Sequence, residues 1–352
     1  MQTISLNTKD KISKIIIGEE FTNIKNYIDI DRTIVITDEN VFKLYEKQFE
    51  GLKTIVIGTG EKIKTLQTIE YIIEKLIEFK ADRKSFILGV GGGVVTDIAG
   101  FVSSIYLRGV EFGFVSTTLL GQVDASVGGK NGVNFKGLKN VIGVFNQPEF
   151  VICDISMLKT LPGREFRSGL AEMIKHGVIG DPSILEQLDE EYEKIISLDQ
   201  ETLEKLIYNS ICVKSKIVSI DERESELRRI LNFGHTVGHA IELAEDLTHG
   251  EAISIGMVAA LGISVEKGYI NINVFIQIEK LLKKYGLPTD LPKDIGKIIE
   301  VIKFDKKNEK DGLNFILIKE LGKAIIEKVD LDELEKLFTS VCKQQLLLGN
   351  VD

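Results

Sequence analysis

The sequence is poor in cysteine and has no hydrophobic run long enough to cross a membrane. Its three cysteines, Cys153, Cys212 and Cys342, lie far apart and form no CxxC pair, which excludes a disulfide framework and favours a reducing compartment. The uncharged stretch Ala252–Val265 would span roughly 21 Å as a helix, less than the roughly 30 Å of a bilayer core. Segment 1–10 lacks the basic start and apolar core of a secretory signal. We therefore expect a cytoplasmic protein with no membrane partner.

Basic residues are also fewer than acidic ones, with 44 Lys and Arg against 53 Asp and Glu and a net charge of -9. This balance argues against a nucleic-acid-binding surface spread over the whole molecule, but not against a local basic pocket. Apolar residues make up 43% and charged residues 28% of the 352 residues, as in globular proteins. The length suffices for about two domains.

The first part of the chain alternates predicted strands and helices. Thr33–Thr37, Thr54–Ile57 and Ser85–Val90 are apolar or β-branched runs, and Lys64–Phe79 carries apolar residues at helical spacing. This order predicts a parallel α/β sheet with right-handed crossovers. Beyond Leu161 helical patterns dominate, so we predict an α/β domain over 1–161 and a mainly helical domain over 162–352. The helices predicted there are Arg164–Val178, Ser183–Tyr192, Glu201–Ser219, Arg229–Ala244 and Glu251–Lys267.

Three glycines, Gly91-Gly92-Gly93, lie between a predicted apolar strand and the predicted helix Val94–Tyr106. Glycines at this place let backbone N–H groups approach a phosphate, and the helix N-terminus adds partial positive charge. The segment therefore predicts a dinucleotide or phosphate site, with a plain strand-to-helix turn as the alternative. It lacks the GxGxxG spacing of the commoner Rossmann fingerprint.

Two further segments follow the predicted strand Glu111–Val115. Ser116–Leu120 places hydroxyl groups where they would cap a helix or bind a cofactor. The glycine-rich stretch Gly121–Gly143 is predicted to be a long functional loop. Its lysines suit an anionic substrate, and ordinary solvated lysines are the alternative.

Histidine is rare in this chain, yet three of the four histidines lie between positions 235 and 249. His235 and His239 are one helical turn apart and share a face, and His249 begins the next helical pattern. Such a group predicts a zinc-type catalytic site with an open coordination position, and buried hydrogen-bonded histidines are the alternative. Spacing alone selects all three histidines. It leaves the carboxylate open among three candidates: Glu172, Glu242 and Glu251.

A series of motifs, in order along the chain, resembles the 3-dehydroquinate synthase family. The motifs are Gly91–Asp97, Arg108-Gly109, Asp124–Lys130, Lys139-Asn140, Gly169–Lys175, Asn232–His239 and His249–Ala252. The resemblance implies conversion of 3-deoxy-D-arabino-heptulosonate 7-phosphate to 3-dehydroquinate and phosphate, a step of the shikimate pathway. It also implies NAD used catalytically, a divalent metal (zinc or cobalt), a homodimer, and a Rossmann-like domain followed by a helical metal- and substrate-binding domain.

Transferred position by position, the family pattern assigns residues to each ligand. It implies Glu172, His235 and His249 as metal ligands, and it moves His239 to a place beside the metal. Arg108 would reach the phosphate bound by the neighbouring subunit. NAD would contact Asp38, Asn40, Glu61, Lys64, Gly92, Gly93, Val94, Asp97, Thr117, Thr118, Asp124, Lys130, Lys139, Thr160 and Leu161. Substrate would contact Lys130, Asn140, Lys175, Lys214, Arg228, Asn232, His239 and a lysine of Asp305-Lys306-Lys307.

The cationic residues favour a 3-dehydroquinate synthase over three alternative kinds of protein. A metal-dependent polyol dehydrogenase would bind a neutral substrate and would not need Lys130, Lys175, Lys214 and Arg228. A related cyclase that makes a ring without a carboxylate would not need Arg228, whose guanidinium suits bidentate carboxylate binding. An inactive NAD-binding module would not need the ligand residues. If the predicted helix is continuous, Arg228 shares a face with Asn232.

Overall fold

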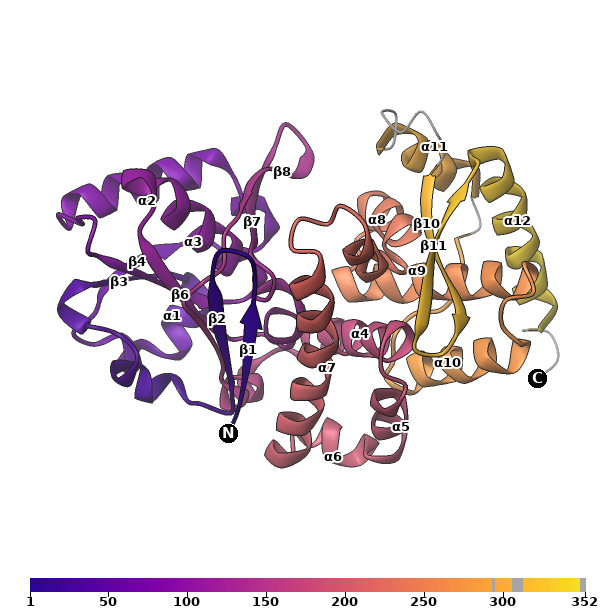
Figure 1. The fold of residues 1–352 in the computed structure, drawn as a ribbon, viewed down its shortest axis with the longest axis horizontal. Helices are drawn as coiled ribbons and strands as arrows, with labels where there is room; N and C mark the ends of the chain where they lie inside the picture. The colour runs from indigo at the N-terminus through magenta and orange to yellow at the C-terminus, as the bar shows by residue number, and fades with distance from the viewer. Residues whose placement is uncertain (293–294, 306–312, 349–352) are drawn as a thin grey trace. The chain divides into compact units, whose positions relative to one another are not determined.

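The computed structural model describes residues 1–292, 295–305 and 313–348 and divides into two compact units (Figure 1). The first comprises Met1–Pro162 with Glu193–Arg223, and the second comprises Gly163–Tyr192 and the chain from Glu224 onward. The sequence patterns predict a single domain for all residues after 161. Segment 193–223 instead belongs to the first unit because its helix α7 (Gln200–Ile220) packs against strand β1 (Gln2–Asn7).

A seven-stranded sheet forms the centre of the first unit, in the order β1-β2-β9-β6-β5-β3-β4. All neighbouring strands are parallel except β1 and β2 (Ile12–Ile17), which form an antiparallel hairpin. The predicted parallel α/β sheet is thus confirmed. The remaining strands are β3 (Thr33–Asp38), β4 (Lys53–Ile57), β5 (Phe86–Gly91), β6 (Glu111–Ser116) and β9 (Phe150–Cys153).

Helices connect the strands from β3 to β6. Helix α1 (Glu39–Leu44) follows β3, α2 (Leu66–Glu78) leads from β4 to β5, and α3 (Gly93–Ile105) leads from β5 to β6. Gly91 at the end of β5 pairs with Ser116 at the end of β6. The glycine turn and the hydroxyl segment therefore leave the sheet side by side at its carboxyl edge, the place where open α/β sheets bind ligands.

The prediction of one long loop over Gly121–Gly143 is wrong. The segment contains a π-helical turn, η6 (Gly121–Ala125), and an antiparallel hairpin of β7 (Lys130–Phe135) and β8 (Leu138–Phe145). Lys136 and Gly137 form the turn with φ of 49° and 83°. Positive φ at both central residues matches the twist of a tight hairpin, but Lys-Gly is a weaker sequence signal than Asn-Gly.

The second unit is mainly helical, and its centre is helix α9 (His249–Glu266), which is buried along almost its whole length. The other helices are α4 (Gly163–Ile179), α5 (Ser183–Glu190), α8 (His235–Ala244), α10 (Ile272–Lys284), α11 (Ile295–Asp305) and α12 (Leu331–Leu348). A hairpin of β10 (Leu313–Glu320) and β11 (Lys323–Val329), absent from the prediction, also packs against α9. In the part of the chain that the structure describes, no helix is long and apolar enough to span a bilayer.

The predicted continuous helix Arg229–Ala244 is interrupted. The chain forms a 3₁₀ segment, η8 (Leu227–Asn232), and α8 begins only after Gly234, whose φ is 79°. Any side chain would be strained at that φ, which explains why the helix restarts there. Because a 3₁₀ helix aligns residues three apart rather than four, the expectation that Arg228 and Asn232 share a face is not supported.

Candidate active site

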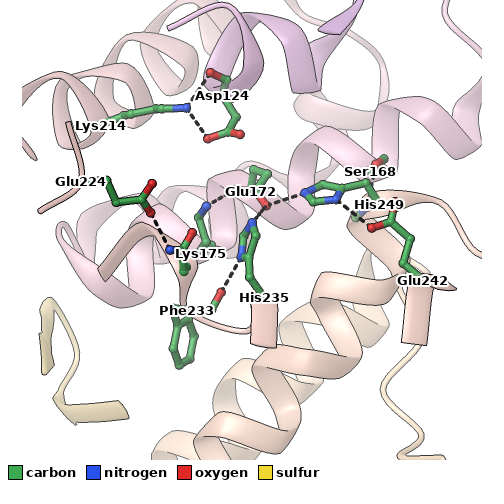
Figure 2. Close-up of polar contacts among 12 residues, drawn as sticks. Asp124, Ser168, Glu172, Lys175, Lys214, Glu224, Phe233, His235, Glu242 and His249 are labelled. Carbon is green, nitrogen blue, oxygen red and sulfur yellow. Dashed lines mark hydrogen bonds and ion pairs between the residues drawn. The ribbon is translucent and has the colours of Figure 1, made fainter. Parts of the chain in front are cut away.

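Three helices of the second unit bring a carboxylate and two imidazoles together (Figure 2). Glu172 lies in the middle of α4, and His235 and His249 are the first residues of α8 and α9. The Nε2 atoms of His235 and His249 lie 3.7 Å and 3.5 Å from Oε1 of Glu172. One ligand atom from each residue lies within 4.8 Å of the others, as a divalent ion with an open position requires.

The second ring nitrogen of each histidine also has a partner. Nδ1 of His235 lies 3.1 Å from the backbone oxygen of Phe233, and Nδ1 of His249 lies 3.6 Å from Oε2 of Glu242. We assign the ring protons to Nδ1, since both partners are acceptors. With the proton on Nδ1, the Nε2 atom of each neutral ring can bind a metal ion, as a metal-binding histidine requires.

Glu172 lies among buried ionisable side chains. Glu172 is fully buried and forms an ion pair with Lys175, one helical turn further along α4 and equally buried. Burial and the Lys175 ammonium hold the pKa of His235 well below its ordinary value, which keeps this ring neutral. For His249, burial lowers the pKa, but the Glu172 and Glu242 carboxylates outweigh it and raise the pKa to about 9.

The backbone at the start of α9 is tied to α4. Arg164 donates two hydrogen bonds to Glu251, of 2.8 Å and 2.7 Å, and one of 3.0 Å to the carbonyl of Asp246. Glu251 and Thr248 form a capping box at the first turn of α9. The amide of Gly250 donates to Oγ of Ser168 at 2.9 Å. These contacts set the position of α9 against the helix that carries Glu172.

The three carboxylates among which residue spacing could not choose a metal ligand differ in their surroundings. Glu172 faces both histidines, Glu242 meets the far side of the His249 ring, and Glu251 is paired with Arg164. The His239 ring is exposed, with its centroid 5.1 Å from that of His235 and 6.0 Å from that of His249. Spacing alone selects His239 as a ligand, whereas the family pattern implies a place beside the metal, and this assignment stays a prediction.

Two more residues of the predicted substrate site lie in η8 of the second unit. The Asn232 side chain donates to Oε1 of Glu224 at 2.6 Å, and Glu224 has a φ of 59°. Arg228 is only 2% exposed and is one of the largest fully buried side chains, which is unusual for arginine. It is thus no ordinary surface residue, in contrast to the half-buried Arg229 that follows it.

In the first unit, close contacts explain the glycines of the predicted cofactor turn. A Cβ atom on Gly92 would lie 2.9 Å from Cγ2 of Thr118, and one on Gly121 would lie 2.4 Å from Oγ of Ser116. The amide of Thr117 donates to the carbonyl of Gly91 at 3.0 Å. The glycine turn, the hydroxyl segment and the start of η6 therefore pack directly against one another.

Two buried lysines of the first unit bind aspartates. Lys64 pairs with Asp97 and donates to Oδ1 of Asn140 at 2.6 Å. Burial raises the pKa of Asp97 more than the Lys64 ammonium lowers it. Lys214 donates to both the backbone oxygen and Oδ1 of Asp124, each at 2.6 Å (Figure 2).

The remaining predicted residues have more local surroundings. Asp38 caps α1 by accepting from the amides of Asn40 and Val41, Glu61 accepts from Asn134, and Thr160 bonds to Tyr45. Val94 lies in the first turn of α3, and Leu161 follows the 3₁₀ segment Ile155–Thr160. Lys130 and Lys139 are exposed on the β7–β8 hairpin. Arg108 has a φ of 71°. Lys306 and Lys307 lie outside the described residues.

Comparisons with known protein families identify the family to which this chain belongs. Two family models match, 3-dehydroquinate synthase N-terminal over residues 54–168 and 3-dehydroquinate synthase C-terminal over residues 169–308. The chain belongs to the 3-dehydroquinate synthase family. A 3-dehydroquinate synthase of Thermoanaerobacter pseudethanolicus is 45% identical over 89% of this chain and 92% of its own. One of Ruminiclostridium cellulolyticum is 39% identical over 94% and 97%.

Solved structures agree on the fold of this family member. A 2-deoxy-scyllo-inosose synthase complexed with carbaglucose-6-phosphate, NAD⁺ and Co²⁺ is 28% identical, with a TM-score of 0.84 over 96% of this chain and 99% of its own. A 2-epi-5-epi-valiolone synthase from Streptomyces hygroscopicus with NAD⁺ and Zn²⁺ is 22% identical, with a TM-score of 0.87 over the same shares. A probable glycerol dehydrogenase from Sinorhizobium meliloti, 15% identical with a TM-score of 0.65 over 94% and 96%, shares the fold alone.

Sequence reasoning missed the residues that support the ligand cluster. Ser168 and Arg164 hold the start of α9, and Glu224 holds Asn232. None of them belongs to a spacing pattern that signals a partner far along the chain. The capping box of Thr248 and Glu251 does have a recognisable Thr-x-x-Glu sequence signal and was open to detection.

Proposed function

We propose that this protein is a 3-dehydroquinate synthase that converts 3-deoxy-D-arabino-heptulosonate 7-phosphate to 3-dehydroquinate and phosphate. The observation that carries the proposal is the placement of Glu172 against the Nε2 atoms of two histidines. It occurs in a chain that is 45% identical to a 3-dehydroquinate synthase over most of its length. The reaction comprises alcohol oxidation, phosphate elimination, ketone reduction, ring opening and aldol closure.

The donor set of the second unit fits zinc or cobalt, and Glu172, His235 and His249 would hold the ion. One carboxylate and two imidazoles leave coordination positions open for two vicinal hydroxyls of the substrate. An ion bound there supplies Lewis acidity to the hydroxyl that is oxidised. The glycine turn of the first unit, with its close-packed Thr118 and η6, would hold NAD, which would supply hydride-transfer chemistry there.

The chain's own cations suit an anionic substrate. Arg228 would bind the substrate carboxylate through two parallel hydrogen bonds, which its planar fork allows and a lysine does not. Lys130, Asn140 and His239 would hold the phosphate group, whose oxygen would take the proton of the neighbouring C–H as the phosphate leaves. Lys175, Lys214 and Asn232 would orient the hydroxyl groups.

Two alternatives from neighbouring enzyme classes have less support. A polyol dehydrogenase would share the fold with the probable glycerol dehydrogenase, but a neutral substrate gives no reason to bury Arg228, Lys175 and Lys214. Carbaglucose-6-phosphate, the ligand in the structure of the related cyclase, has no carboxylate. A cyclase for such a substrate would not need the buried Arg228. The activity assay below separates all three enzymes.

The proposal includes a cytoplasmic homodimer. Four apolar side chains of the β7–β8 hairpin are exposed. Two further exposed apolar residues are Ile105, the last residue of α3, which packs against the hairpin, and Leu107 in the 3₁₀ segment Tyr106–Arg108 that follows. These residues are Phe135, Leu138, Val141, Phe145, Ile105 and Leu107. A second copy would cover this apolar patch and meet the adjacent Arg108, which would then reach the partner's phosphate site. Light scattering after gel filtration should give twice the chain mass, and Leu138→Lys should reduce it.

The decisive experiment incubates the metal-loaded protein with NAD and the heptulosonate phosphate. We expect phosphate release and ring product in equal amounts, with NAD required but not consumed. Stoichiometric build-up of NADH would support the dehydrogenase. Turnover of a carboxylate-free sugar phosphate in preference to the heptulosonate would support the related cyclase.

A further inference from the structure

Two carboxylates from different helices flank the two nitrogens of the His249 ring (Figure 2). Nε2 lies 3.5 Å from Oε1 of Glu172 on α4, and Nδ1 lies 3.6 Å from Oε2 of Glu242 on α8. We propose that Glu242 is a positioning residue that holds the His249 ring in the orientation and tautomer needed for metal binding. The inference rests on the proposed metal site and assigns a role to a residue outside its ligand set.

The chemistry of imidazole explains why such a residue is needed. A neutral imidazole has one N–H, so a metal ion on Nε2 requires the proton to be on Nδ1. A carboxylate that accepts this proton in a hydrogen bond fixes the ring plane and makes Nε2 a stronger donor. Glu242 is 15% exposed at its side chain, which limits competition from water.

His235 provides a comparison within the same site. Its Nδ1 faces the backbone oxygen of Phe233 at 3.1 Å, a partner that any residue at position 233 would supply. This partner lies only two residues before His235 in the chain. His249 instead lies where α9 begins, and its ring is held from α8 by a side chain. One ligand is therefore oriented by backbone, and the other depends on the identity of residue 242.

Glu251 offers a matched control, since it lies two residues after His249 on the same helix. Its carboxylate accepts from Arg164 and from the amide of Thr248 at 2.8 Å. Glu251 therefore secures the backbone at the start of α9, whereas Glu242 contacts the imidazole ring itself. Replacing each by glutamine separates loss of helix anchoring from loss of ring orientation.

The groups of His239, Glu242 and His249 also offer ligand atoms within 4.8 Å of one another. An ion held there through Nδ1 of His249 would compete with an ion on Nε2, because one neutral ring has only one free lone pair. Occupation of both places would require loss of both ring protons. A single ion on Nε2 with Glu242 as acceptor is the arrangement that needs no such step.

The first test measures metal affinity of the apoprotein against a competing chelator, together with the visible spectrum of the cobalt-loaded protein. We expect Glu242→Ala to weaken zinc binding by about 10–100-fold and to alter the cobalt ligand-field bands. Glu242→Gln, which keeps an acceptor but loses the charge, should fall between Ala and the native residue. Glu251→Gln should lower the unfolding midpoint of the apoprotein and leave the cobalt spectrum unchanged.

The second test observes the ring protons by NMR with ¹⁵N-labelled histidine in the zinc-loaded protein. The Nδ1 proton of His249 should exchange faster with water in Glu242→Gln, while that of His235 stays unchanged. Native affinity and spectrum in both Glu242 variants would overturn the inference. A second zinc ion per chain that Glu242→Gln or His239→Ala removes would overturn it as well.

The same measurements distinguish this inference from the proposed metal site. If Glu172→Gln and His235→Ala keep native zinc affinity, the proposed ligand set itself is wrong. If those variants lose zinc and the Glu242 variants do not, the ligand set stands and only the role of Glu242 fails.

Discussion

The two compact units assemble their polar clusters in different ways. In the first, the glycine turn and the hydroxyl segment follow neighbouring parallel strands, so the sheet itself brings them to one edge. In the second, Glu172, His235 and His249 come from three helices and meet only because those helices pack together. The succession of strands and turns along the chain can be inferred from local patterns, but the packing of distant helices cannot, which is why the first cluster is easier to anticipate.

Charge is also distributed differently in the two units. In the first, Lys64 and Lys214 each meet an aspartate. In the second, the single carboxylate of Glu172 faces the Lys175 ammonium and two imidazoles. The cluster of the second unit should therefore be sensitive to changes of side-chain charge. The close-packed glycine turn of the first unit should be sensitive to changes of side-chain volume.

The largest effect is expected where the second cluster loses a ligand. His249→Ala removes the Nε2 atom that lies 3.5 Å from Glu172. We expect loss of zinc and of nearly all activity, by about a thousandfold or more, because an open catalytic site needs each of its ligands. Metal content by mass spectrometry and the rate of phosphate release test this. Full metal content with an undiminished rate would contradict the ligand assignment.

Next comes the stability of the metal-free protein. Glu172→Gln leaves the Lys175 ammonium buried without its carboxylate, which should lower the free energy of unfolding by about 3–5 kcal/mol. Urea unfolding of the apoprotein measures the loss. The double variant Glu172→Gln with Lys175→Met removes both charges and should recover much of the stability. If the single and double variants are equally destabilised, uncompensated charge is not the cause.

Substrate recognition by the second unit should respond to a smaller change. Arg228→Lys keeps the charge but loses the bidentate geometry, so kcat/KM should fall by an amount equivalent to about 1.5–3 kcal/mol. The neighbouring variant Arg229→Lys is the control and should have little effect. Steady-state kinetics with the heptulosonate phosphate as substrate measure kcat/KM for both variants. Equal behaviour of the two variants would remove the main argument against a carboxylate-free substrate.

The smallest expected effect is steric and lies in the first unit. Gly121→Ala would place a methyl group 2.4 Å from Oγ of Ser116, costing about 1–3 kcal/mol of stability and weakening NAD binding. Adding Ser116→Ala removes the obstructing oxygen and should restore much of the stability and of the NAD affinity. Thermal unfolding and NAD titration measure the two effects. Failure of the second substitution to rescue would show that the close approach is not responsible.

Local patterns in the sequence were sufficient for some features and insufficient for others. The buried strands β3 and β5 appear as apolar runs, and the glycine turn follows β5 as predicted. The hairpin β7–β8 escaped prediction because Lys136-Gly137 is a weak turn signal and the edge strand β8 is largely exposed. The break at Gly234 escaped because apolar periodicity continues on both sides of it.

The amino-acid sequence by itself determined the α/β sheet, the glycine turn and the kinds of side chain available for metal and phosphate chemistry, because each depends on residues close together in the chain. Residue spacing left open which carboxylate meets the histidines, and the tertiary structure shows that contact, the ring nitrogen that faces it, and the packing of α7 with the first unit. These outcomes depend on distances between residues far apart in the chain. The spacing of His235, His239 and His249 therefore could not distinguish Glu172 from Glu242 or Glu251, and the packing of α4, α8 and α9 does.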